Sequence, residues 1–253
     1  MEFDYHKAVQ EGNVFEKNVF VEYGAVIGKN NIFSNNCVIR SCCVIGDNNF
    51  FSTNVTIGSL SRERFQGPSK PKNITESPKV IIGNNNIFED NVVIQLSLEK
   101  TTKIGNNVCI GAFTHVSHDT EIKDYVITAS HCSIGGYCVL LENANLGMGS
   151  RIHQRTVIGS LVMIGAGSVV VNHILPYSTV VGVPAHFLQT NKVGLKRAGL
   201  TNDEIEVIEK WLTSKSTILL PEKLYYPIRA FKCAVKLWRR RRGIIPNIEI
   251  NVY

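Results

Sequence analysis

The string His115-Val116-Ser117-His118-Asp119 holds the side chains of this sequence that are best suited to acid–base chemistry. A carboxylate next to an imidazole can fix the tautomer of the ring and raise its basicity, which suits a general base. We therefore interpret His118 as a candidate base and Asp119 as the group that orients it. The competing interpretation is a surface histidine in a turn.

A spacing of 18 residues brings further candidates to the same place. If the chain coils with three six-residue faces per turn, successive turns lie about 4.8 Å apart as parallel strands. Gly136 then lies above His118, and Gln154 lies above Gly136 next to His153. A glycine beside a base leaves its backbone N–H accessible, and this donor can stabilise the oxyanion formed when a thioester carbonyl is attacked. The spacing thus predicts one site from these four residues.

The element that must position them is a repeat of six residues, and such periodicity decides the fold class before other signals. Neither the 3.6-residue period of a helix nor the two-residue period of an amphipathic strand fits it. Apolar residues recur, with Thr128 as the exception, at Val9, Phe15, Val21, Ile27, Phe33, Ile39, Ile45, Phe51 and Ile57, at Ile82, Phe88 and Ile94, and at Ile104, Ile110, Val116, Ile122, Ile134, Leu140, Leu146, Ile152, Ile158, Ile164 and Val170.

Glycine and asparagine often follow these inward positions, as in Ile27-Gly28 and Lys29-Asn30-Asn31. Both residue types tolerate the left-handed backbone angles of tight corners. We predict a mainly β protein, a left-handed parallel β-helix of hexapeptide repeats over residues 1–185, followed by a short C-terminal α-helical region over residues 186–253.

Two interruptions and a tail modify this prediction. Prolines and charges break the repeat over residues 59–79, and a shorter break covers residues 96–103, so both segments are expected to loop out of the coil. In the tail, Thr201 and Glu204 form a capping-box pattern, and a second helix is expected from about Pro221.

Composition narrows the class of protein. The net charge of +6 gathers near the C-terminus, at Lys236 and residues 239–242, without the interleaved aromatic residues of a nucleic-acid surface. No apolar run approaches the ~20 residues of a membrane span and no signal peptide is recognisable, so we expect a cytoplasmic protein.

The seven cysteines include no C-x-x-C pair, which argues against a zinc site or a disulfide framework. Four of them each come four positions after an inward residue, where the coil needs a small side chain. Cys37, Cys43, Cys132 and Cys138 are therefore expected in the core.

Residues 114–200 resemble the UDP-N-acetylglucosamine acyltransferase family, which begins lipid A synthesis, within the wider hexapeptide acyltransferases. The matching strings are HVSHD at 115–119, IHQ at 152–154 and NKVGLKRAGL at 191–200. The resemblance implies a homotrimer with active sites between subunits, in which His118, oriented by Asp119, deprotonates the acceptor and the Gly136 amide binds the oxyanion. It places His115, His153, Asn191 and Arg197 on the substrate cleft.

The sequence also departs from that family. SLSRERFQG stands where the family carries Gln-Asp-Leu-Lys, Gln95 and Tyr137 stand at histidine positions, and Val193 stands at a glutamate position. The residues that are lost resemble those that contact the UDP-sugar and the acyl chain. The Val183-Pro184-Ala185 string is common where hexapeptide acetyltransferases hold coenzyme A. This combination suggests the same chemistry on a different acceptor.

Three functional hypotheses follow. The preferred one is acyl transfer from a thioester, with acyl-CoA favoured over acyl carrier protein, to the amino group of a nucleotide-linked amino sugar. The alternative is the 3-O-acylation of UDP-N-acetylglucosamine from acyl carrier protein in lipid A synthesis. The third is a non-catalytic β-helix scaffold. A zinc-dependent carbonic anhydrase is disfavoured, because the seven histidines include no pair five positions apart. No permanently bound cofactor and no metal is expected.

Overall fold

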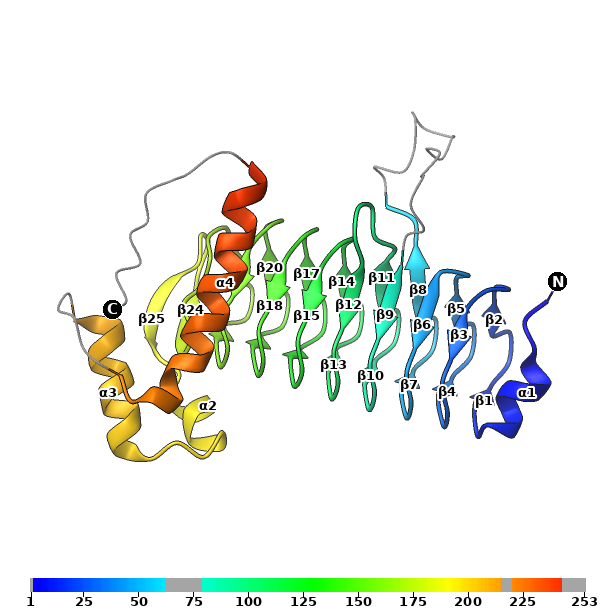
Figure 1. Cartoon of the computed structure of the whole chain (residues 1–253), viewed down its shortest axis with the longest axis horizontal. Coiled ribbons are helices and arrows are strands. Elements are labelled where there is room, and N and C mark those ends of the chain that lie inside the picture. The colour runs from blue at the N-terminus through cyan, green and yellow to red at the C-terminus, as the bar shows by residue number, and fades with distance from the viewer. Residues whose placement is uncertain (1, 62–78, 215–219, 243–253) are drawn as a thin grey trace.

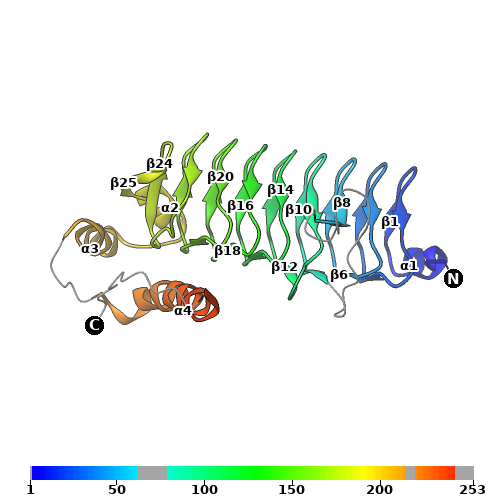
Figure 2. The same ribbon diagram turned by 90° about the horizontal axis from the view of Figure 1, so that it is seen from above.

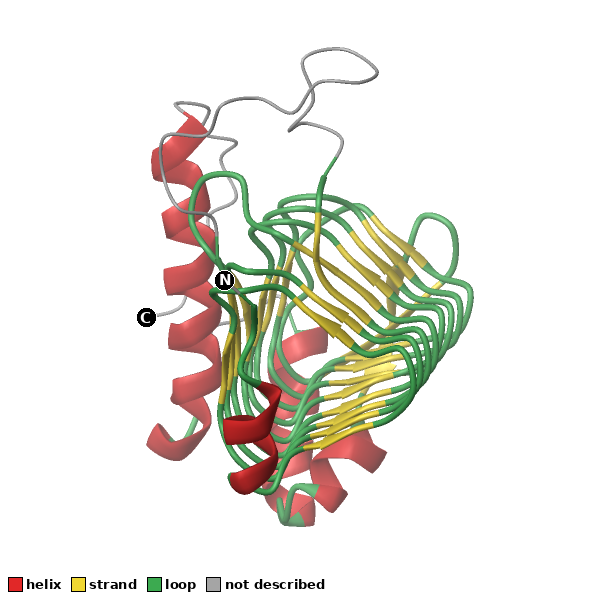
Figure 3. Cartoon of the chain, turned by 90° about the vertical axis from the view of Figure 1, so that its right-hand side faces the viewer, coloured by secondary structure: helices red, strands yellow, loops and turns green. Residues whose placement is uncertain are grey.

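The computed structural model of the chain describes residues 2–61, 79–214 and 220–242. These residues form a left-handed parallel β-helix with helices at both ends, and the rungs are stacked along the long axis of the molecule (Figure 1). Seen along that axis, the coil has three sides (Figure 3). The predicted fold class is confirmed. No helix among the described residues is long and apolar enough to cross a membrane.

Each side of the coil is one sheet, and the chain visits the three sheets in turn. Sheet A contains β1 (Val14–Phe15), β4 (Ile32–Phe33), β7 (Phe50–Phe51), β10 (Ile87–Phe88), β13 (Cys109–Ile110), β16 (Ile127–Thr128), β19 (Asn145–Leu146), β22 (Met163–Ile164), β24 (Ser178–Val181) and β25 (His186–Thr190). Sheet B contains β2 (Phe20–Val21), β5 (Val38–Ile39), β8 (Thr56–Ser59), β11 (Val93–Gln95), β14 (His115–Val116), β17 (Ser133–Ile134), β20 (Arg151–Ile152) and β23 (Val169–Val170). Sheet C contains β3 (Val26–Ile27), β6 (Cys43–Ile45), β9 (Val80–Ile82), β12 (Thr102–Ile104), β15 (Glu121–Ile122), β18 (Val139–Leu140) and β21 (Val157–Ile158).

The core is a set of side-chain ladders, because parallel in-register strands place like residues above one another. Phe33 and Phe51 stack with ring centroids 4.7 Å apart, and Phe51 and Phe88 follow at 4.8 Å. A buried asparagine ladder runs beside them, in which the side chain of Asn49 donates to that of Asn31 at 2.9 Å. The six-residue series therefore marks the interior, as predicted.

Val9 is the exception to that series. It lies on α1 (Tyr5–Gln10) and its side chain is 55% exposed, so its prediction as an inward repeat position was wrong. The reason is local, because Asp4 accepts a hydrogen bond from the backbone N–H of Lys7 and starts a helix. The N-terminal end of the coil is capped by this helix, whose Tyr5 ring packs against Phe15.

The C-terminal region begins with a strand rather than a helix, because β25 pairs antiparallel with β24 and extends sheet A. The helices that follow are α2 (Lys192–Arg197), α3 (Asn202–Thr213), the 3₁₀ turn η2 (Glu222–Leu224) and α4 (Tyr225–Arg242). The predicted capping box of Thr201 and Glu204 is present at the start of α3.

Helix α4 lies along the outside of sheet C near its C-terminal strands (Figures 1 and 2). Phe231, Ala234 and Val235 of α4 are buried against Leu141 and Val157 of the coil. Complete burial of a residue such as Phe231 stabilises the contact by roughly 1.5–3 kcal/mol. The side chains of the basic run at residues 239–242 lie outside the described part of the chain.

Candidate active site

His118 and Asp119 form a buried pair at the corner between sheets B and C, directly after β14. The two side chains meet with Nδ1 of His118 3.0 Å from Oδ2 of Asp119. An ionised carboxylate can only accept a hydrogen bond, so this contact favours the tautomer with its proton on Nδ1, in which Nε2 can act as an acceptor. Asp119 has a φ of 56°, a left-handed conformation that aspartate tolerates and that turns its side chain toward its neighbour. The pair therefore has the arrangement of an oriented base.

The second interruption of the repeat holds Asp119 in place. The backbone N–H groups of Leu98, Glu99 and Lys100 donate to the Asp119 carboxylate at 2.8, 3.2 and 2.7 Å. The hydroxyl of Thr102 accepts the backbone N–H of Asp119 at 2.9 Å. The predicted break at residues 96–103 is thus an ordered loop between β11 and β12 that cradles this carboxylate. Residues 62–78, most of the first predicted loop, lie outside the described residues.

Gly136 lies against the imidazole of His118, as the 18-residue spacing predicts. Strands β14 and β17 pair with His115 opposite Ser133, which places residue 136 over residue 118. A Cβ atom on residue 136 would lie 2.6 Å from Cε1 of His118, so only glycine fits beside the ring. Within the described residues, the Gly136 N–H donates to no other group. This leaves a donor next to the candidate base, where an oxyanion would need one.

Tyr137 and Arg155 complete the wall of this corner. The Tyr137 ring meets the His118 ring edge-on at a centroid distance of 5.0 Å, and the Arg155 guanidinium lies 4.9 Å from the Tyr137 centroid. Burial and the nearby carboxylates of Glu99 and Asp119 raise the pKa of Tyr137, so its hydroxyl stays protonated. From the sequence, Tyr137 was noted only because it stands at a histidine position of the resembled family, and Arg155 was not identified. The same spacing, 137 plus 18, would have found Arg155.

His115 and His153 both line a hollow of about 270 Å³ on the outer face of sheet B. Its aliphatic lining comes from Val169 and Val171, since the side chains of Ile134 and Ile152 are buried in the core. Burial lowers the pKa of His115, and the charge of His118 adds to the effect. His153 is exposed, and its Nδ1 lies 3.1 Å from the Gln154 carbonyl oxygen. Gln154 is itself exposed at the next rung above Gly136.

Asn191 and Arg197 lie elsewhere in the chain. Asn191 is the N-cap of α2, and its side chain donates to the carbonyl of Leu161 at 2.9 Å, at the corner between sheets C and A. Arg197 is exposed near the end of the same helix. A single chain therefore does not bring these two residues to the corner that carries His118.

The four cysteines predicted in the core are fully enclosed. Burial raises the pKa of Cys138 to about 12, which keeps the thiol protonated and unsuited to nucleophilic attack. Among the described residues, no three histidine, cysteine or acidic side chains gather in a way that could hold a metal ion.

Comparisons with known proteins bear on this geometry. The family described as bacterial transferase hexapeptide (six repeats) matches residues 9–59 and 101–136. Both matched stretches lie almost entirely in the part of the chain where the six-residue repeat forms the coil. One solved structure that resembles this β-helix is a UDP-N-acetylglucosamine acyltransferase from Bacteroides fragilis, with a TM-score of 0.65, 22% identity, and 86% of this chain and 92% of that chain covered. The acyltransferase from Campylobacter jejuni has a TM-score of 0.62 at 25% identity, with 82% and 83% covered.

Relatives with similar sequence have names of the same kind. Acyl-[acyl-carrier-protein]–UDP-N-acetylglucosamine O-acyltransferase from Gloeothece citriformis is 33% identical over 134 residues, which cover 52% of this chain and 49% of the relative. The enzyme of that name from Paracoccus denitrificans is 34% identical over 140 residues, 54% of each protein. The match thus spans about half the length of these relatives. The resemblance to this family, stated from the sequence motifs, is confirmed.

Proposed function

We propose that this protein transfers an acyl group from a thioester to a sugar carried on a nucleotide, with His118 as the general base. The observation that carries the proposal is the corner itself. Asp119 holds Nδ1 of His118, and the Gly136 amide lies beside the same ring. This arrangement combines an imidazole base oriented by a carboxylate with a donor for an oxyanion, as acyl transfer requires.

The proposed reaction balances at these atoms. Nε2 of His118 removes the proton from the acceptor group as that group forms a bond to the thioester carbonyl carbon. The carbonyl oxygen takes up the electron pair, and the Gly136 N–H stabilises it. When the intermediate collapses, the carbon–sulfur bond breaks and the imidazolium returns its proton to the leaving thiolate. Asp119 stabilises the imidazolium between these steps.

For donor and acceptor, the relatives favour acyl carrier protein and a hydroxyl of UDP-N-acetylglucosamine, since their names state both. This reverses the preference drawn from the sequence. The aliphatic hollow on sheet B supports a donor whose acyl chain is longer than acetyl. We therefore propose O-acylation from an acyl carrier protein as the reaction, with lipid A synthesis as its context and the cytoplasm as its location.

N-acylation of a nucleotide-linked amino sugar from acyl-CoA is the second candidate. It is favoured by the changed surroundings of the base. The Gln95 side chain accepts the backbone N–H of His118 at 3.3 Å, and the Tyr137 ring contacts the imidazole, where the resembled family carries histidines. A different pair of contacts next to the base is compatible with a different acceptor.

One assay separates these candidates. The purified protein is offered 3-hydroxyacyl carrier protein or the matching acyl-CoA, each with UDP-N-acetylglucosamine or a UDP-linked amino sugar, and the products are treated with alkaline hydroxylamine. An ester product is cleaved, whereas an amide survives. His118→Ala should lower kcat by roughly 10²–10⁴-fold with the true pair. Activity that survives this substitution would contradict the proposal, and inactivity with all four pairs would favour a scaffold.

We also propose a homotrimer in which Asn191 and Arg197 of one subunit meet the His118 corner of the next. Mixing inactive His118→Ala and Arg197→Ala proteins, followed by unfolding and reassembly, should then restore part of the activity, because some corners receive both intact residues. The measurement is activity of the mixture beside the two variants treated alone. Equal inactivity of all three samples would contradict a shared site.

A further inference from the structure

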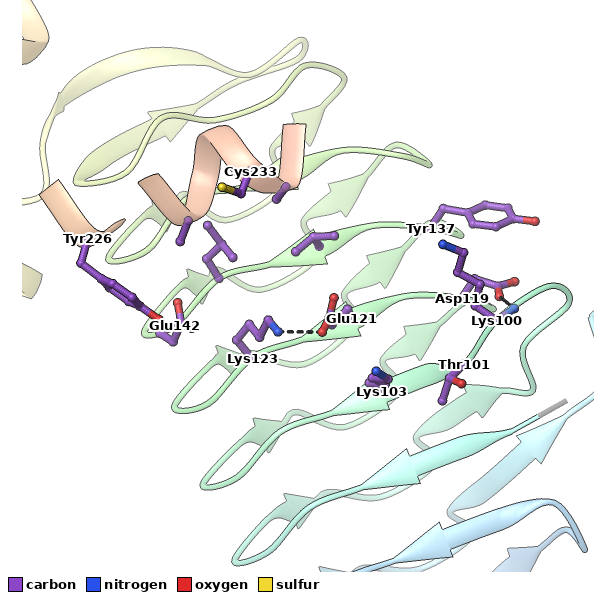
Figure 4. Close-up of a pocket in the computed structure, with 14 residues that line it drawn as sticks. Lys100, Thr101, Lys103, Asp119, Glu121, Lys123, Tyr137, Glu142, Tyr226 and Cys233 are labelled. Atoms are coloured by element: carbon purple, nitrogen blue, oxygen red, sulfur yellow. Dashed lines mark hydrogen bonds and ion pairs between the residues drawn. The ribbon is translucent and has the colours of Figure 1, made fainter. Parts of the chain in front are cut away.

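A second and larger hollow, of about 460 Å³, lies between α4 and the outer face of sheet C (Figure 4). One wall is apolar, formed by Val139 and Leu141 of the coil and by Ala230 and Ala234 of the helix. The opposite side carries Lys103 of β12, Lys100 from the loop before that strand, and Lys123 directly after β15. A hollow of this volume is in the range that holds a drug-sized molecule. We call it the α4 groove.

One end of the α4 groove lies next to the candidate active site, although neither His118 nor Gly136 lines it. Asp119 and Tyr137 line that end, and both contact His118 directly. The other end is bordered by Lys123, Glu142 and Tyr226 (Figure 4). From Asp119 to Lys123 the chain takes four steps through β15 (Glu121–Ile122), which span at most about 13 Å. The groove is therefore elongated and starts beside the base.

Of the three lysines that line the groove, one is in an ion pair with another described residue and two are not. Lys123 is paired with Glu121 at 2.6 Å. Burial alone would lower the pKa of Lys123, but the hydrogen bond and charge of Glu121 outweigh it and raise that pKa. Lys100 and Lys103 are exposed and form no ion pair with any other residue that the structure describes. Lys100 lies at the Asp119 end of the groove, and the free ammonium group of Lys103 beside the apolar wall favours a long ligand that carries an anion.

We infer that the α4 groove binds the phosphopantetheine arm of the thioester donor. The inference rests on the proposed function insofar as the donor is a thioester. The sulfur end would lie at His118, and the gem-dimethyl carbons would face the apolar wall. The amide groups can bond to Thr101 and Glu121, and the phosphate falls toward the ammonium group of Lys103. The arm is shared by coenzyme A and acyl carrier protein, so the assignment holds for either donor.

Cys233 provides a direct reporter of this occupancy. It is an exposed residue of α4 that lines the groove, whereas Cys37, Cys43, Cys132 and Cys138 are buried. The experiment alkylates the full-length protein with iodoacetamide and follows the Cys233 peptide by mass spectrometry. The probe is S-methyl coenzyme A, a thioether that carries the arm but cannot transfer an acyl group. A Cys233→Ser variant identifies the signal.

The expected result is that saturating probe slows alkylation of Cys233 by at least ~5-fold, in proportion to occupancy. S-methyl pantetheine, which lacks the phosphate, should protect less at equal concentration. Lys103→Ala should weaken protection by the probe about 5- to 10-fold in concentration, as expected for loss of a charge-assisted contact. Lys29→Ala, an exposed lysine outside the groove, is the matched control and should leave protection unchanged.

Three outcomes would overturn the inference. They are no protection by the probe, equal protection in Lys103→Ala, or protection by UDP-N-acetylglucosamine instead, which would assign the groove to the acceptor. These results are independent of the fate of the proposed function. A protein that loses activity in His118→Ala but shows no protection keeps the function and loses the groove. A protein that is protected by the probe but transfers no acyl group keeps the assignment of the groove and loses the proposed function.

Discussion

The backbone N–H of Lys100 donates to the Asp119 carboxylate at 2.7 Å, although 19 positions separate the two residues. A loop that interrupts the repeat is thereby joined to the residue that orients the candidate base. Leu98 and Glu99 donate to the same carboxylate. The loop fixes Asp119 through its main chain, so the amino-acid types in the loop can vary as long as these N–H groups are present. The departure from a regular repeat is thus part of the site.

Lys100→Pro tests this relationship, because proline lacks the backbone N–H. Loss of one hydrogen bond to a carboxylate should lower kcat roughly 10-fold, with a smaller change in the KM of the acceptor. Lys100→Ala is the matched control, since it keeps the N–H and removes only the ammonium, and its kcat should stay close to that of the wild type. Steady-state kinetics and the Tm of both variants provide the measurement. Equal kcat values for the two would contradict a positioning role of this amide.

Gly136→Ala should disable the site by contact with the imidazole. The added Cβ would lie 2.6 Å from Cε1 of His118, so the ring must move away from its position on Asp119. We expect kcat to fall by roughly 10²–10³-fold, the range found when an oxyanion donor or its alignment is lost. Gly149→Ala is the control, because its φ of 69° causes backbone strain while its Cβ meets nothing within 4 Å. A Gly136→Ala enzyme as active as Gly149→Ala would exclude this geometry.

Phe50 and Phe51 offer a matched test of the core. Phe51 is fully buried in the aromatic stack, whereas its neighbour Phe50 is 38% exposed on the outside of sheet A. Phe51→Ala should lower the free energy of unfolding by ~3–5 kcal/mol, since it removes transfer energy and leaves a cavity. Phe50→Ala should cost much less. Denaturant unfolding of both variants gives the comparison, and similar losses would show that the six-residue register is misplaced.

Much of this fold is predictable because the six-residue repeat determines both which side chains point inward and which residues stack on one another. The inward positions, the 18-residue stacking of His118 and Gly136, and the core location of Cys132 all follow from one period. Val9 matched that period by coincidence, and the hydrogen bond from Lys7 to Asp4 placed it on a helix instead. The six-residue period predicts which residues of the coil point inward. It does not predict where a local N-cap hydrogen bond starts a helix instead.

The surroundings of the base are harder to predict, for a physical reason. Three backbone N–H groups hold Asp119, and main-chain donors leave no trace in residue type. The α4 groove depends on the docking of a C-terminal helix against Leu141 and Val157, a contact between distant segments. Arg155 is different, since it was within reach of the spacing argument that found Gly136.

His115 predicts how stability depends on pH. Burial lowers the pKa of His115 in the folded protein below its ordinary value of about 6.5. Between the two values the unfolded chain binds more protons than the folded chain, so stability falls as the pH drops below about 6.5. His115→Gln removes this term and should show a smaller loss of Tm between pH 7.5 and pH 5.5 than the wild type. His6→Gln, an exposed histidine on α1, removes the same number of titrating groups and should retain the full loss. Identical pH dependence in His115→Gln and the wild type would mean that His115 is as free to charge in the folded state as in the unfolded chain.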